Sequence, residues 1–192
     1  MPNRIDNKFK QLKDQNKKAL ITYVMAYDPD YDTSRDIVMK LPEAGADIIE
    51  LGIPFSDPMA DGPTIEKASI RALKHNVKTE KIFDIVADFR KNNNDTPIIL
   101  MGYYNVVQHY GCEKFVKEAK NKGIDGFIIV DLPPEEDSEL NSLCVQNDLS
   151  LIKLVTPTTD KNRIKTITEK ASGFIYYVAV AGITGTKSAS YE

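Results

Sequence analysis

Short, nearly continuous apolar runs alternate along the chain with longer segments in which apolar residues recur at helical spacing. Such runs are typical of parallel strands that are covered on both faces. Between them, a segment such as the one holding Ile82, Ile85 and Phe89 follows the period of an amphipathic helix. The alternation predicts a parallel α/β fold. The predicted strands are Ala19 to Met25, Ala46 to Gly52, Pro97 to Met101, Gly126 to Asp131, Ser150 to Val155 and Phe174 to Ala179.

The predicted helices carry local start signals. Thr33 with Asp36 has the spacing of a capping box, which predicts that a helix begins there. Pro134 is followed directly by three acidic residues, which favours a second helix start at this point. A further helix ahead of the first strand would carry Ile5 and Phe9.

Two architectures fit this order of elements: an open doubly wound sheet and a (β/α)₈ barrel. The first strand is not followed by a Gly-x-Gly-x-x-Gly turn, and the chain has no Gly-Lys-Ser/Thr loop. Strand-helix units of similar size favour the barrel. We therefore predict a single barrel domain over residues 1–192. Because such barrels typically need about 250 residues, about six of the eight units are expected in this chain.

Composition and charge argue against several classes of protein function. A net charge of −3 gives no general attraction to nucleic acid or to an anionic membrane. The polar N-terminal segment lacks the apolar core of a secretory signal, and no apolar run is long enough to span a bilayer. Cys112 and Cys144 are too few for a disulfide framework and lack metal-site spacing. A cytoplasmic protein without metal is the expectation.

Glu50 is the strongest candidate for catalysis. It interrupts an apolar strand near the strand's carboxyl end, where barrels of this kind place their active sites. Burial would raise the pKa of its carboxyl group, which suits a general acid and base near neutral pH. The alternative is a solvated or ion-paired acid at a strand end.

The loop after this strand is rich in Pro and Asp and holds a second carboxylate, Asp61. It precedes Gly62 and Pro63 at a helix start, so an N-cap is the competing interpretation. Asp57, which stands before a proline, favours a turn role.

Other polar groups follow the remaining strands. Tyr103 comes directly after the third strand, at the mouth of the expected pocket, and Asp131 ends the fourth. Tyr23 and Tyr176 lie within the first and sixth strands, where either could line a site or pack in the core. The small, glycine-rich loop at 181–186 could cradle a phosphate or act as a lid.

One long motif, Glu50-Leu-Gly-Ile-Pro-Phe-Ser-Asp-Pro-Met-Ala-Asp61-Gly-Pro-Thr-Ile, closely resembles the tryptophan synthase alpha subunit family. The resemblance extends over the whole chain. It rests further on Met101 to Asn105, Asp125 to Pro133, Thr156 to Thr159 and Tyr176 to Thr186. It implies a (β/α)₈ barrel and a lyase of tryptophan biosynthesis. The implied reaction is retro-aldol cleavage of indole-3-glycerol phosphate to indole and glyceraldehyde 3-phosphate.

The resemblance also implies roles for the two carboxylates. Glu50 matches the general acid and base that serves the indole ring carbon and the glycerol hydroxyl. Asp61 matches the acid that holds the indole N–H and stabilises positive charge on the ring.

The substrate-binding positions implied in the same way are Tyr23, Met101, Tyr103, Tyr176, Thr184 and Gly185. One departure is Tyr27, which stands where many family members have glycine and is expected to reshape the first loop.

The resemblance implies a partner as well. Family members form an α₂β₂ tetramer with a beta subunit, which takes up the indole and carries pyridoxal phosphate, so the alpha chain itself needs no cofactor. The segment around Asp57 matches the face that signals to that subunit. The alternative is a catalytically incomplete fragment that only binds the beta subunit.

Overall fold

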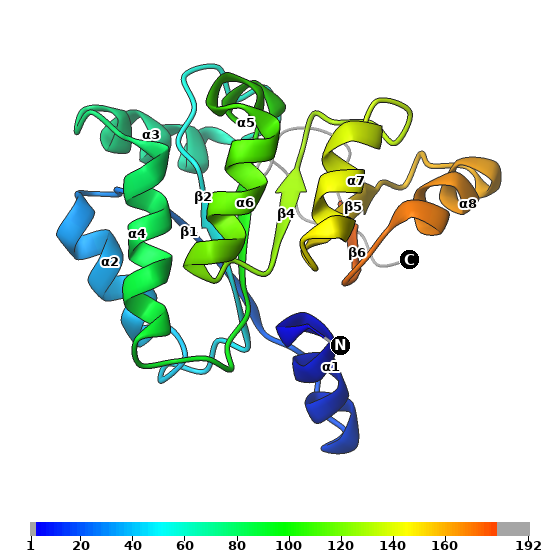
Figure 1. Cartoon of the computed structure of the whole chain (residues 1–192), viewed down its shortest axis with the longest axis horizontal. Coiled ribbons are helices and arrows are strands. Elements are labelled where there is room, and N and C mark those ends of the chain that lie inside the picture. The colour runs from blue at the N-terminus through cyan, green and yellow to red at the C-terminus, as the bar shows by residue number, and fades with distance from the viewer. Residues whose placement is uncertain (1–2, 180–192) are drawn as a thin grey trace.

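The computed structural model describes residues 3–179 and contains six parallel strands in one curled sheet (Figure 1). The strands lie side by side in chain order. A doubly wound sheet would instead reverse its strand order at a switch point, so this order decides for the barrel architecture. The described residues form six of the eight strands of a (β/α)₈ barrel. The strands are β1 (Ile21–Met25), β2 (Ile48–Gly52), β3 (Ile98–Gly102), β4 (Gly126–Ile129), β5 (Ser150–Val155) and β6 (Ile175–Tyr177).

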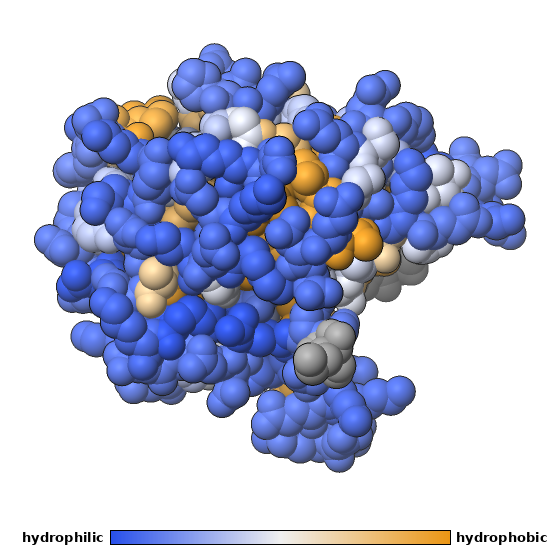
Figure 2. Space-filling model, viewed as in Figure 1, coloured by the Kyte–Doolittle hydropathy of each residue, from blue (hydrophilic) through white to orange (hydrophobic). Residues whose placement is uncertain are grey.

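The helices of the described part surround the sheet. Figure 1 shows α2, α4, α6, α7 and α8 along one side, with α1 at the lower end, beneath the strands. The outer helices present a mostly hydrophilic surface, interrupted by a hydrophobic band between α6 and α7 (Figure 2). No helix within residues 3–179 is both long and apolar enough to cross a bilayer. The helices are α1 (Arg4–Asp14), α2 (Tyr31–Lys40), α3 (Pro63–Leu73), α4 (Thr79–Arg90), α5 (Tyr104–Tyr110), α6 (Cys112–Lys122), α7 (Ser138–Gln146) and α8 (Lys161–Lys170).

The predicted strands are confirmed, with small shifts at their ends. The run from Ser150 to Val155 is a strand over its whole length. The fourth strand ends at Ile129 rather than at Asp131. Asp131 lies in the turn that follows, where its carboxylate accepts the backbone N–H of Tyr104 at 2.7 Å.

Both predicted helix starts are wrong by several residues. Asp30, not Thr33, is the N-cap of α2, and its carboxylate accepts both the backbone N–H and the hydroxyl of Thr33, each at 2.8 Å. The helix expected at Pro134 begins at Ser138. The intervening residues form a turn that brings the fully buried Asp137 carboxylate to the Nζ of Lys153.

The core has two layers, one on each face of the sheet. The outer layer packs the sheet against the helices and includes Ile49, Leu51 and Phe127. The inner layer consists of four isoleucines, one from each of β2 to β5, with Ile5 of α1 packed against them. Because successive strand residues point to opposite faces, these two sets fix which side chains face the barrel interior. The four strand residues of the inner layer are Ile48, Ile99, Ile128 and Ile152.

An ion-pair cluster closes the amino-terminal end of the sheet. The Asp125 carboxylate accepts a guanidinium N–H from Arg4 at 2.9 Å, one from Arg90 at 2.7 Å and the backbone N–H of Ile98 at 2.8 Å. Arg90 also donates to the backbone carbonyls of Thr96 and Gly123. The cluster ties α1 to the end of the sheet opposite the carboxyl ends of the strands.

Candidate active site

Glu50 lies on the inner wall of the barrel. Its neighbours Ile49 and Leu51 belong to the outer core layer, so the Glu50 side chain points inward. The residue is only 3% exposed, and its Oε1 accepts no hydrogen bond from the described residues. Burial raises the pKa of the Glu50 carboxyl group from 4.5 to about 7. At neutral pH both the acid and the carboxylate are therefore populated.

Two tyrosines share this wall with Glu50. Tyr23 of β1 is paired in register with Glu50. Burial raises the pKa of its phenol, and the negative charges of Asp61 and Glu50 raise it further. Burial likewise raises the pKa of Tyr176 in β6, with Glu50 adding to the effect. Both phenols consequently stay protonated and can donate hydrogen bonds beside the two carboxylates.

A glycine makes room for one of these rings. A Cβ placed on Gly52 would come within 2.7 Å of the Tyr23 Cζ, so any side chain at this position would displace the ring. Met101 of β3 is paired in register with Gly52 and is half-buried against the inner core layer. The predicted residues Tyr23, Glu50, Met101 and Tyr176 are thus brought to one face of the sheet, near the carboxyl ends of their strands.

Asp61 lies in the loop between β2 and α3 and is half-buried. It is not an N-cap, because Gly62 holds that position in α3 without any side-chain hydrogen bond, and Pro63 is the first helical residue. Burial raises the pKa of the Asp61 carboxyl group, whereas a hydrogen bond from the Tyr103 hydroxyl lowers it. The Asp61 carboxyl group therefore lies near Tyr103, the residue that follows β3.

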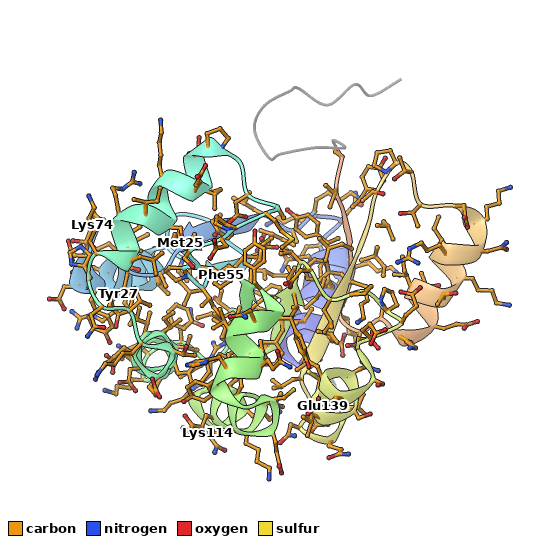
Figure 3. The ribbon with its side chains drawn as sticks, turned by 90° about the horizontal axis from the view of Figure 1, so that it is seen from above. Met25, Tyr27, Phe55, Lys74, Lys114 and Glu139 are labelled. Atoms are coloured by element: carbon orange, nitrogen blue, oxygen red, sulfur yellow. The ribbon has the colours of Figure 1, made fainter. Side chains whose placement is uncertain are left out.

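The Asp61 loop is held at its start by contacts that sequence reasoning missed. The buried Ser69 hydroxyl of α3 accepts the backbone N–H of Phe55 at 3.0 Å and donates to the Phe55 carbonyl at 2.9 Å. Figure 3 views the molecule from above and shows Phe55 toward the middle, whereas Lys114 and Glu139 lie on the outer helices. Ser69 lies 14 positions after Phe55, so the local sequence gives no sign of this pair of hydrogen bonds. Only the folded chain brings these groups together.

Comparison with known proteins settles the family. The family model described as tryptophan synthase alpha chain matches residues 9–192. The chain belongs to this family. Membership makes it a lyase of tryptophan biosynthesis, as the resemblance of its sequence implies.

Solved structures of the same family superimpose closely. The tryptophan synthase alpha subunit of Legionella pneumophila is 43% identical with a TM-score of 0.90, over 93% of this chain and 68% of that one. A Mycobacterium tuberculosis tryptophan synthase structure is 32% identical with a TM-score of 0.92, over 98% and 72%. A tryptophan synthase complex from Pyrococcus furiosus is 41% identical with a TM-score of 0.79, over 83% and 65%. The chain therefore spans 65% to 72% of the length of these relatives.

Of the remaining predicted positions, Asp57 lies within the described residues and Thr184 and Gly185 do not. Asp57 is exposed on the β2–α3 loop, where its Oδ2 accepts the Ser56 hydroxyl at 2.5 Å. The next apolar residue, Met59, is 77% exposed. Thr184 and Gly185 lie outside the described residues, so their role in holding phosphate stays a prediction.

Tyr27 has a backbone conformation that is unusual for a residue with a side chain. Its φ of 65° lies in the left-handed region that favours glycine. The residue is held there by a hydrogen bond from its N–H to the Ser34 hydroxyl at 3.1 Å and by edge-on packing of its ring against Tyr31 at 5.2 Å. The loop thus keeps a glycine-like backbone while adding a buried ring outside the site.

The chemistry of the inner wall is that of carboxylates and phenols. Within residues 3–179, no three His, Cys, Asp or Glu side chains gather to hold a metal ion. Cys112 and Cys144 are both buried and unpaired. Such a wall can exchange protons with a small molecule and stabilise a cation.

Proposed function

We propose that Glu50 and Asp61 carry out the retro-aldol cleavage of indole-3-glycerol phosphate to indole and glyceraldehyde 3-phosphate. The observation that carries the proposal is Glu50 itself, a carboxyl group aimed into the barrel with a pKa near neutrality. The reaction needs a group that can both give and take a proton at physiological pH. A carboxyl group with its ordinary pKa of 4.5 would be almost entirely ionised there.

The proton balance assigns the steps. Protonation of the indole ring carbon that bears the glycerol chain gives a cation whose C–C bond to the chain can break. The glycerol hydroxyl next to that bond loses its proton as its carbon becomes the aldehyde. Glu50 donates the first proton and accepts the second, so it ends as it began. Asp61 accepts the indole N–H and, as an anion, stabilises the ring cation.

The walls around the two carboxylates would hold the ring. Met101 offers an apolar, adaptable surface, and the Tyr23 and Tyr176 rings flank Glu50. We infer that the phosphate is held by the segment carrying Thr184 and Gly185. These contacts follow from the family match and from the inward direction of the three inner-wall side chains.

We further propose a beta subunit as partner. The Pyrococcus furiosus relative was solved as a tryptophan synthase complex. The exposed loop with Asp57 and the projecting Met59 lies directly before Asp61, so a partner seated on it could act on the site. Pyridoxal phosphate would belong to that partner in an α₂β₂ tetramer, not to this chain. A cytoplasmic setting remains a prediction.

Turnover of the purified protein tests the proposal. Indole and glyceraldehyde 3-phosphate should appear in equal amounts from indole-3-glycerol phosphate, faster when a beta subunit is present. Asp61→Asn should lower the rate strongly while keeping affinity for the phosphate. Glu43→Gln, which changes an exposed carboxyl group far from the site, is the matched control and should behave as wild type. Normal binding of the beta subunit without indole release would support the binding-only alternative instead.

A further inference from the structure

The group that holds Asp61 in place is Tyr103, the first residue after β3. Tyr103 is 3% exposed. Its hydroxyl oxygen accepts the backbone N–H of Ala60 at 3.0 Å, and the same hydroxyl lies close enough to the Asp61 carboxyl group to lower its pKa. Two adjacent residues of the β2–α3 loop, Ala60 and Asp61, therefore lie at the phenol of Tyr103.

The direction of these two bonds is fixed by chemistry. A backbone N–H can only donate, and an ionised carboxylate can only accept. The phenol oxygen therefore accepts the hydrogen bond from Ala60, and the phenol O–H is free to donate a hydrogen bond toward Asp61. Burial raises the pKa of Tyr103 to about 12, so this proton is present at neutral pH. The interaction is stronger when Asp61 is ionised, because an anionic oxygen accepts a phenol proton more strongly than a neutral carboxyl oxygen does.

The ring of Tyr103 holds the other end of the same loop. It stacks on Phe55 with centroids 5.2 Å apart and planes 29° from parallel. Phe55 is in turn bracketed by the Ser69 hydroxyl of α3. The loop from 54 to 62 is thus gripped at its start by the ring and at its end by the hydroxyl.

Resting on the proposed function, we propose that Tyr103 is a positioning residue, which holds the loop that carries Asp61 and keeps the Asp61 carboxylate aimed at the indole ring. This role differs from the substrate contact expected from the sequence, because the hydroxyl is already engaged on both sides by the loop. Asp61 alone, half-buried, would tend to take up a proton and lose its ability to stabilise a cation.

The test removes the hydroxyl and keeps the ring. Tyr103→Phe preserves the stack on Phe55 but deletes both bonds of the phenol. Tyr110→Phe is a matched control, because it deletes a phenol-to-carboxylate bond of the same kind, to Glu118 on the outer helices. Carbon-13 NMR titration of the Asp61 carboxyl group, assigned with Asp61→Asn, reports its ionisation directly and needs no turnover.

We expect Tyr103→Phe to raise the Asp61 midpoint by about one pH unit, because the burial effect is no longer opposed. Tyr110→Phe should leave the midpoint at its wild-type value. Indole release by Tyr103→Phe should fall by about tenfold at neutral pH and recover toward the wild-type rate as pH rises. A uniform loss of rate at every pH would mark a merely structural role.

Two failures are distinguishable. If wild type releases no indole, the proposed function is wrong, yet the titration still decides the role of Tyr103. If the Asp61 midpoint is the same in wild type and Tyr103→Phe, the positioning role is overturned even when the enzyme is active. Urea unfolding of Tyr103→Phe establishes that each comparison is made on folded protein.

Discussion

Glu50 should destabilise the fold in a way that depends on pH. The pKa of its carboxyl group is raised to about 7 in the folded chain, from an ordinary value of 4.5. Between these two values the folded state binds more protons than the unfolded state, so stability falls as pH rises. At roughly 1.4 kcal/mol for each pH unit of the difference, the total loss is about 3 kcal/mol. It is absent below pH 4.5 and complete above pH 7.

Glu50→Gln removes this effect because an amide of similar shape has no charge to bury. Urea unfolding at a series of pH values from 4 to 9 should show the variant gaining on wild type by about 3 kcal/mol, mostly between pH 4.5 and 7. The control Glu43→Gln, at an exposed position, should give a difference that is flat with pH. A flat difference for Glu50→Gln would refute the claim that the folded protein holds this carboxyl group at a raised pKa.

Two further changes test the packing that supports the site. Gly52→Ala should displace the Tyr23 ring, since the new Cβ would come within 2.7 Å of the Tyr23 Cζ. We expect the free energy of unfolding in urea to fall by about 1–3 kcal/mol. The KM for indole-3-glycerol phosphate should rise as well. Unchanged KM would contradict this view of the pocket. Asp125→Asn removes the negative charge that faces the Arg90 guanidinium, whose side chain is only 9% exposed. The free energy of unfolding should fall by about 3 kcal/mol, while kcat of the folded protein stays the same. A stability within experimental error of wild type would show that the cluster contributes little.

Local patterns predicted the strands and singled out the buried carboxyl group of Glu50 because those features depend on neighbours in sequence. Continuous apolar runs identify strands covered on both faces, and Glu50 is conspicuous as a charge inside such a run. The near-equal spacing of the units favoured the barrel, which the sequential strand order confirms.

The sequence could not supply the contacts that connect distant residues. Asp61 before Gly-Pro has the local appearance of an N-cap, and only the fold brings Tyr103, 42 positions later, to its carboxylate. The same limit explains the misplaced helix start at Pro134. The acidic residues after Pro134 suggested a helix start, but the Asp137 carboxylate instead binds the Nζ of Lys153 in β5.

Turnover at neutral pH, compared between wild type and Glu50→Gln, tests the central claim most directly. Because the substrate carries the same indole ring, released indole is separated from it by extraction into an organic solvent before it is measured. We predict steady indole release by wild type and none above background by Glu50→Gln, although the variant is folded and more stable. Indole release by Glu50→Gln at a rate near that of wild type would contradict the assignment of proton transfer to Glu50.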